Sequence, residues 1–196
     1  MNLSFAKYWP KRMPKHLAEM RTDFIEKIWS SIPEDQLREF YKSKYKVDFY
    51  DREAMEILLK ERADYPINWP YYDQINKRYK KYKAHTFRED KKDRWGKESD
   101  IHFYINTRST KQFLFAPVIP CKAVQKIQII HSLSNPGVAR IKIDGELYYE
   151  GHFNRNSWRL KALAFNDGFE SQEDLFHWFN QDFSGKIIHW TNLIKY

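Results

Sequence analysis

Hydrophobic and polar positions follow two different periods along this chain, helical before residue 63 and alternating after residue 83. Residues 3–5 alternate in the manner of a short strand, which ends before Pro10. Over residues 22–63 the apolar side chains recur at helical spacing, and this spacing predicts three helices. Their inward-facing residues are Phe24, Ile25, Ile28, Trp29 and Ile32 in the first helix, Leu37, Phe40 and Tyr41 in the second, and Met55, Leu58 and Leu59 in the third.

Capping residues predict where these helices begin. Thr22 precedes the first apolar residue of the first helix, where its hydroxyl can accept a main-chain hydrogen bond. Residues 31–34, with the sequence SIPE, have the form of a capping box with proline in the first turn. The third helix is expected over residues 51–63. Two prolines then bound a linker, and residues 71–81 predict one or two further helical turns.

After Lys83 the pattern changes to short alternating runs that are bounded by turn residues. Asp144-Gly145 lies between two of these runs and is typical of a β-hairpin. Residues 171–174 form a capping box that opens one late helix, and a last strand is expected at residues 186–190. The other predicted strands cover residues 85–88, 100–106, 113–115, 123–130, 138–143 and 146–149.

Short strands followed by one late helix predict an α+β fold built around a small, curved sheet or barrel. The opening strand at residues 3–5 needs a partner in that sheet. We therefore interpret the helical block at residues 22–81 as an insertion after the first strand, or as a lobe, within a single domain spanning residues 1–196.

The positive charge of the chain is concentrated in one window. The 196 residues carry a formal net charge of +8, and residues 77–97 contain ten Lys and Arg against three acids. Aromatic residues make up 17% of the chain, so rings that stack on bases accompany the cations that meet phosphates. This composition permits nucleic-acid binding without requiring it, because charge runs are often solvated surface.

Motifs for cofactors and metals do not occur in the sequence. It has six glycines and neither GxGxxG nor GxxxxGKS/T, and it lacks CxxC and HExxH. The single cysteine, Cys121, cannot form an internal disulfide and fits a reducing compartment. The first residues lack the apolar core of a signal peptide, and no run approaches 18 apolar residues. We therefore expect a cytoplasmic protein with no cofactor, no metal and no membrane contact.

The basic window contains a cluster of reactive groups. Lys83, His85, Thr86 and Arg88 bring an amine, an imidazole, a hydroxyl and a guanidinium into six residues. A lysine can hold a phosphate or activate a hydroxyl, and an arginine can fork onto an oxyanion. The cluster predicts one wall of a pocket for an anionic or nucleotide ligand, and the alternative is a solvated basic strand and turn.

Five short motifs, in this order, resemble the ASCH domain of the PUA-like fold group: KAHTFRED, DRW, IHF, DGFES and GKIIHWTNL. The resemblance covers about residues 82–196, with residues 3–5 as the opening strand. It implies a small mixed β-barrel with helices at its rim, in a group associated with RNA or modified-nucleotide binding. The version with helices between the opening strand and the first motif is similar to proteins common in bacteriophages and prophages.

The resemblance also implies roles for individual residues. Small bacterial N4-acetylcytidine amidohydrolases of this family carry a Lys-x-x-Thr-x-Arg segment, which falls here on Lys83, Thr86 and Arg88. Their distal acid, a Glu, falls on Asp167. Thr86 would then be the nucleophile, Lys83 its activating base or proton carrier, and Asp167 a charge partner or acid. A lysine acts as a base when burial or a nearby cation, such as Arg88, lowers its pKa.

The expected ligand contacts are Arg88, His85, Arg94, Trp95 and Arg108. Structural alternatives exist for several candidates. Thr86 is also ordinary strand packing, Asp167 with the following glycine is also turn chemistry, and His85 is also a structural histidine. Trp95 suits the core as well as base stacking, and Arg108 suits a solvated loop.

Four functions remain open from the sequence. An RNA- or nucleotide-binding module is favoured, because it needs only a basic cleft with a stacking ring. The alternatives are a hydrolase of an acylated nucleoside, a metal-independent ribonuclease, and binding of a host protein through the aromatic-rich block at residues 22–81.

Overall fold

The alternating runs in the second half of the chain form a five-stranded antiparallel sheet with the order β10-β9-β8-β11-β4. The computed structural model describes residues 1–67, 72–73, 78–79, 82–192 and 196. Strand β4, which carries the basic segment, lies at one edge of this sheet. The strands are β4 (His85–Arg88), β8 (Ala123–His131), β9 (Val138–Ile143), β10 (Glu146–His152) and β11 (Phe183–His189). The hairpin predicted at Asp144-Gly145 is confirmed, because these residues connect β9 to β10.

A smaller sheet forms around β5 and includes the start of the chain. Strand β1 pairs in parallel with β5 and places Leu3 opposite Phe103. The predicted opening strand is therefore completed by a segment that follows the whole helical block. The strands of this sheet are β1 (Asn2–Ser4), β5 (Asp100–Ile105), β6 (Phe113–Leu114) and β7 (Ile119–Pro120).

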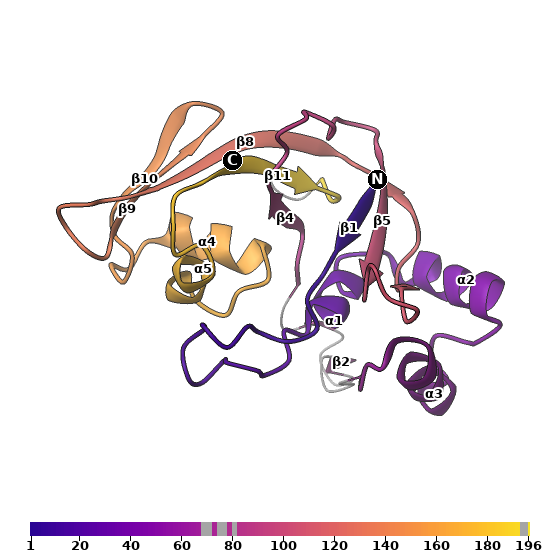
Figure 1. The fold of residues 1–196 in the computed structure, drawn as a ribbon. Coiled ribbons are helices and arrows are strands. Elements are labelled where there is room, and N and C mark those ends of the chain that lie inside the picture. The colour runs from indigo at the N-terminus through magenta and orange to yellow at the C-terminus, as the bar shows by residue number, and fades with distance from the viewer. Residues whose placement is uncertain (68–71, 74–77, 80–81, 193–195) are drawn as a thin grey trace.

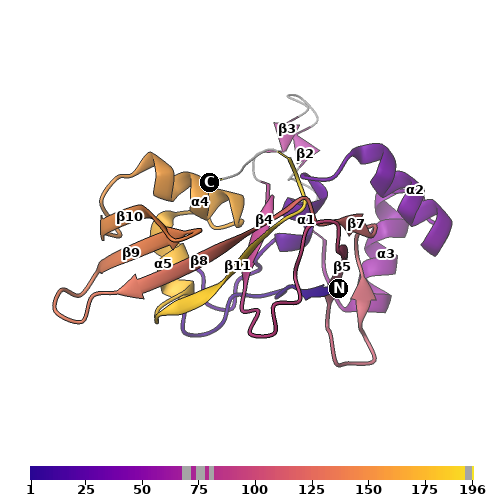
Figure 2. The same cartoon turned by 90° about the horizontal axis from the view of Figure 1, so that it is seen from above.

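Five helices are present in the described part of the chain, and four of them lie in two pairs. Helices α4 and α5 lie beneath the five-stranded sheet, and α2 and α3 lie on the opposite side of the molecule, beyond β5 (Figures 1 and 2). None of the described helices is long and apolar enough to cross a membrane. Their bounds are α1 (Phe24–Trp29), α2 (Glu34–Tyr45), α3 (Arg52–Ala63), α4 (Trp158–Asn166) and α5 (Gln172–Trp178).

Local capping signals predicted some helix starts and failed at others. Helix α3 begins as expected, with the side chain of Asp51 accepting the main-chain N–H of Ala54. The capping box predicted at residues 31–34 is wrong, because α2 has Pro33 at its N-cap and no side-chain cap. The hydroxyl of Ser31 instead accepts the indole N–H of Trp190. The Ser31 hydroxyl, which the predicted cap would need, is therefore used in a tertiary contact.

Helix α4 was not expected, since only one late helix was predicted. Its start is capped by Ser157, and Leu160 and Leu163 face the core. Trp158 and Phe165, however, are 76% and 46% exposed. Large apolar residues on the solvent side blur the amphipathic pattern from which a helix is recognised.

The helical turns expected over residues 71–81 are wrong at the positions that the structure describes. Strand β2 (Tyr72–Asp73) pairs antiparallel with β3 (Arg78–Tyr79), and the register places Tyr72 opposite Tyr79. Aromatic residues favour strands, so the local preference agrees with this pairing. Residues 71, 74–77 and 80–81 lie outside the described part of the chain.

The expected α+β class is confirmed, whereas the described strands form open sheets and do not close into a barrel. Strands β1 and β4 are the outer strands of the two larger sheets. Where these sheets meet, Arg88 Nη2 donates to the main-chain carbonyl of Ser4. Phe5, Phe103 and Trp190 pack together at this junction, with the Phe103 and Trp190 ring centroids 5.3 Å apart. A side-chain contact and an aromatic core thus replace a strand ladder here.

Candidate functional site

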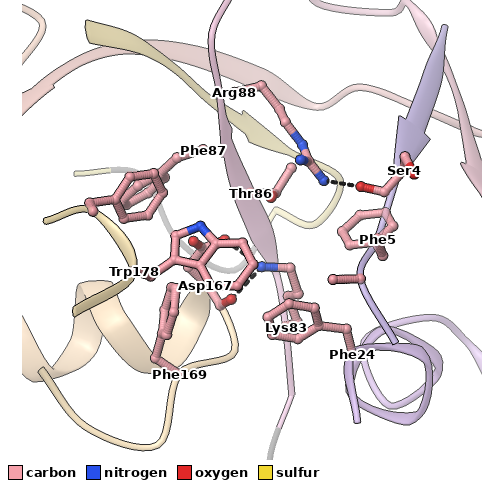
Figure 3. A pocket seen from close by; sticks show the side chains of 12 residues that line it. Ser4, Phe5, Phe24, Lys83, Thr86, Phe87, Arg88, Asp167, Phe169 and Trp178 are labelled. Atoms are coloured by element: carbon pink, nitrogen blue, oxygen red, sulfur yellow. Dashed lines mark hydrogen bonds and ion pairs between the residues drawn. The ribbon is translucent and has the colours of Figure 1, made fainter. Parts of the chain in front are cut away.

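A pocket of about 350 Å³ opens at the junction of the two sheets, beside the free edge of β4 (Figure 3). Lys83, Thr86, Arg88 and Asp167 line it together, so the structure brings these four predicted residues to one place. Its volume lies within the range of small-molecule sites, which is about 300–1,000 Å³. The rest of the wall consists of Ser4, Ala6 and six aromatic residues: Phe5, Phe24, Phe87, Phe169, Trp178 and Phe179.

Lys83 and Asp167 form a buried pair at the base of the pocket. The amine of Lys83 donates to both the main-chain carbonyl and the carboxylate of Asp167. The two residues are 2% and 3% exposed. Main-chain bonds fix the segment before β4, because Lys83 N donates to Lys27 O at 2.9 Å and Ala84 N to Asn166 O at 2.8 Å. Helices α1 and α4 therefore set the position of the amine.

The turn after α4 brings the carboxylate of Asp167 to the amine. Gly168 follows with a φ of +86°, in the region that only glycine adopts readily. A Cβ at this position would lie 3.2 Å from Lys83 Cδ and 3.2 Å from Phe24 Cε1. Asp167 is thus a turn residue and a pocket residue at once, and Gly168 makes both roles compatible.

Burial dominates the electrostatics of this pair. It lowers the pKa of Lys83 to about 8, with Arg88 and Lys27 acting in the same direction and the attraction of Asp167 opposing it. Burial also raises the pKa of Asp167, against the attraction of Lys83. Both shifts favour the neutral forms of the two groups, because burial penalises their charged forms.

Thr86 faces the carboxylate rather than the amine. Its side chain is 4% exposed, and its hydrogen bonding to Asp167 lowers the pKa of that carboxyl. Among the described contacts none joins the Thr86 hydroxyl directly to the Lys83 amine. The carboxylate of Asp167 is therefore hydrogen-bonded on one side by Thr86 and on the other by Lys83.

Arg88 stands at the rim of the pocket with a hydrogen-bond donor unused. Its Nη2 donates to Ser4 O, and its guanidinium carbon lies 5.1 Å from the centroid of the Phe5 ring. Arg88 Nε is buried and has no hydrogen-bond partner within the part of the chain that the structure describes. A buried polar group without a partner costs about 1–3 kcal/mol, and an acceptor on a ligand would remove that cost.

Lys27 supports the pocket and was missed from the sequence. Its amine donates to Gly168 O at 2.8 Å and to Glu170 Oε1 at 2.8 Å, so it holds the turn that carries Asp167. Burial lowers the pKa of Lys27 to about 8. Every residue of α1 is buried, so the helix has no exposed polar face. The sequence pattern therefore did not show that Lys27 supports the pocket.

His85 lies on β4 but faces away from the pocket. It is fully buried against the rings of His189 and Tyr196, with centroid distances of 5.3 and 5.5 Å. Neither of its ring nitrogens has a hydrogen-bond partner among the described residues. Burial lowers the pKa of His85 well below its ordinary range. Strand alternation separates this histidine from Thr86.

The other three predicted ligand contacts do not line the pocket. Trp95 is 6% exposed, and its main-chain N–H donates to Asp90, so it belongs to the core. The side chain of Arg94 is 63% exposed and lies 3.9 Å from the same carboxylate group. Arg108 is exposed in the loop between β5 and β6.

Comparisons of the chain with protein-family models, with curated proteins and with solved structures found no match. The resemblance to the ASCH domain therefore stays a prediction that rests on the sequence motifs. In the described part of the chain, no three His, Cys, Asp or Glu side chains are grouped so as to hold a metal ion.

Proposed function

We propose that this protein is an ASCH-type, PUA-like protein of the cytoplasm that binds a nucleotide or modified nucleoside of RNA in the β4 pocket. The observation that carries the proposal is the convergence of Lys83, Thr86, Arg88 and Asp167 on one cavity with aromatic walls. The mixed α+β class and the opening strand completed by β5 support the proposal, whereas the open sheets differ from the barrel that the resemblance implies.

The chemistry of the pocket walls suits such a ligand. Aromatic rings such as Phe169 and Trp178 offer faces on which a base can stack. The buried Lys83–Asp167 pair offers donors and acceptors for the polar edge of a base. Arg88 supplies a guanidinium in the pocket wall, and a phosphate is an acceptor for its charge-assisted hydrogen bonds.

Calorimetric titration with cytidine 5′-monophosphate tests the binding proposal. We expect the wild-type chain to bind and Arg88→Gln to weaken binding by about tenfold or more, since a charge-assisted hydrogen bond contributes about 1.5–3 kcal/mol. Arg108→Gln removes an equal charge outside the pocket and should bind like wild type. Absence of binding by the wild type, or equal loss in both variants, would count against the proposal. Melting curves separate lost binding from unfolding.

A second candidate function is the hydrolysis of an acylated nucleoside such as N4-acetylcytidine. Two observations favour it: the pKa of Lys83 is lowered to about 8, and Thr86 shares a hydrogen bond with Asp167. Thr86 Oγ would attack the acyl carbon while its proton passes to Asp167 and Lys83. The C–N bond would then break with that proton delivered to the leaving amine, and water would release the acyl group as a carboxylic acid.

Turnover of N4-acetylcytidine, followed by its absorbance, tests the second candidate. We expect turnover by the wild type, a large loss in Thr86→Val, Lys83→Ala and Asp167→Asn, and partial activity in Thr86→Ser. Thr86→Val preserves the shape of the side chain, whereas Thr86→Ser preserves the hydroxyl. Wild-type activity at background level would exclude this function, and full activity in Thr86→Val would exclude Thr86 as nucleophile.

A further inference from the structure

A second cavity, of about 450 Å³, lies between the five-stranded sheet and the loop that follows β4. We call it the basic groove. The loop contributes Asp90, Lys91 and Asp93. The sheet contributes Lys126, Ile127, Gln128, Lys142, Gly145, Ser184, Gly185 and Lys186. Apart from the buried Ile127, its side chains are polar, in contrast to the aromatic walls of the β4 pocket.

Strand register shows that these polar side chains form adjacent rows on one face of the sheet. Lys186 of β11 lies opposite Lys126 of β8. In the next row Gln128 lies between Ser184 and Lys142. Residues directly opposite one another share a face of the sheet. The alternate residues Ile127, Ile129 and Ile141 are buried in the core, so the polar rows lie on the other face.

The same register connects the basic groove to the β4 pocket. Arg88 is the partner of Lys186 across the β4–β11 pair, and Lys186 is the partner of Lys126. Arg88, Lys186 and Lys126 therefore form one row of cations over three neighbouring strands. The row begins at the rim of the β4 pocket and ends inside the basic groove.

Positive charge remains in the groove after its internal ion pairs are formed. Lys186 binds Asp93 and, at 3.1 Å, Asp90, so both acids of the groove share one lysine. No carboxylate of the described residues lies within ion-pair distance of Lys126 or Lys142. Lysines on neighbouring strands repel each other, and an anion laid across them relieves that repulsion.

We propose that the basic groove binds the phosphate backbone of a single-stranded RNA, one nucleotide of which occupies the β4 pocket. This inference rests on the proposed function, because it extends the RNA from the nucleotide in the β4 pocket, past Arg88, into the basic groove. A chain of regularly spaced phosphates matches cations on neighbouring strands, such as Arg88, Lys126 and Lys142, better than a single small anion does. Gln128 and Ser184 add uncharged hydrogen-bond partners for phosphate or ribose oxygens. The β4 pocket would then select the nucleotide, and the groove would supply affinity without reading sequence.

Fluorescence anisotropy with a labelled oligocytidylate of about ten nucleotides, a length within usual single-strand site sizes, tests the inference. The double variant Lys126→Gln/Lys142→Gln should bind the oligonucleotide about tenfold more weakly than wild type. The slope of log affinity against log salt should fall by about 1.4, since each lost phosphate contact on a single strand removes about 0.7. Calorimetry with cytidine 5′-monophosphate should show no change, because the β4 pocket is intact.

The double variant Lys42→Gln/Lys60→Gln is the matched control, since it removes two exposed lysines on α2 and α3. It should bind the oligonucleotide like wild type. Equal loss in both double variants, or no loss in the groove variant, overturns the inference. An oligonucleotide that binds no tighter than the mononucleotide also overturns it, while leaving the β4 pocket assignment standing.

Two further outcomes are decisive. If the wild type binds neither mononucleotide nor oligonucleotide, the proposed function and this inference fall together. If an oligoglutamate displaces the RNA as well as unlabelled RNA does, the groove is a general polyanion surface, and its assignment to RNA is overturned.

Discussion

Lys83 and Asp167 are separated by 84 positions in the sequence, yet the amine of one donates to both the main-chain carbonyl and the carboxylate of the other. The pair joins the segment before β4 to the end of α4. Four predictions follow from this pair, from the turn and pocket beside it, and from two buried residues outside the pocket.

Removing the charge of Asp167 should lower the pKa of Lys83 further. Asp167 is the strongest influence that raises the pKa of this buried amine, while burial, Arg88 and Lys27 all lower it. We therefore expect Asp167→Asn to bring the pKa of Lys83 below about 8. Lysine side-chain NMR over a pH titration measures the value. Asp35→Asn, on an exposed part of α2, should leave it unchanged, and a rise toward the ordinary 10.5 would contradict the assignment.

Replacing Gly168 should disturb the pocket as well as the backbone. Gly168→Ala forces a left-handed residue to carry a Cβ, which costs about 1–2 kcal/mol, and it also crowds Lys83 and Phe24. Gly145→Ala is a matched control, because Gly145 has a φ of +92° and open space around its Cβ position. Chemical denaturation should show that both variants lose stability. Nucleotide affinity should fall in Gly168→Ala alone.

Trp95 and Trp178 should separate a core role from a ligand role. Trp95→Leu should lower the free energy of unfolding by about 2 kcal/mol or more, because it leaves a cavity in the core. Its affinity for cytidine 5′-monophosphate should stay within about twofold of wild type. Trp178→Leu removes a ring from the pocket wall and should weaken that binding by about 1–3 kcal/mol. The reverse pattern would place the stacking ring at Trp95.

The buried His85 should make the fold sensitive to acid. The unfolded chain takes up a proton on this residue as pH falls through 6.5, whereas burial keeps the folded residue neutral to a much lower pH. Stability from this residue is therefore complete above pH 6.5 and decreases below it. His85→Phe should reduce the loss of unfolding free energy between pH 6.5 and 5 by up to about 1.4 kcal/mol per pH unit. Denaturant titrations at pH 8, 6.5 and 5 measure this, and identical slopes in the two chains would contradict it.

Local patterns predicted those parts of the molecule that depend on neighbouring residues. Asp144-Gly145 forms the β9–β10 turn, and Asp51 caps α3. Thr86 and Arg88 are two positions apart on β4, so they share one face of the strand, and both line the pocket. Their spacing in the sequence predicted this shared face. The meeting of both residues with Asp167 was anticipated from the motif resemblance, not from any local pattern.

Features that depend on distant packing could not be predicted in this way. The Ser31 hydroxyl serves Trp190 instead of a helix cap, and Lys27 is buried because α1 is enclosed on all sides. Strand β4 lies at the edge because β11 pairs with β8 on one side and with β4 on the other. Residue patterns do not specify this strand order. The resemblance implied a barrel, whereas the described sheets are open. Strand order decides whether a sheet closes, and residue patterns do not specify it.

The contact between Arg88 and Ser4 has a mechanical consequence for the site. The outer strands of the two sheets are joined there by a guanidinium and an aromatic core, and β1 and β4 share no strand ladder. An anion that recruits Arg88 competes with the carbonyl of Ser4 for the same side chain. Anion binding by Arg88 would then be coupled to the contact between the two sheets, while the pairing of β1 with β5 persists.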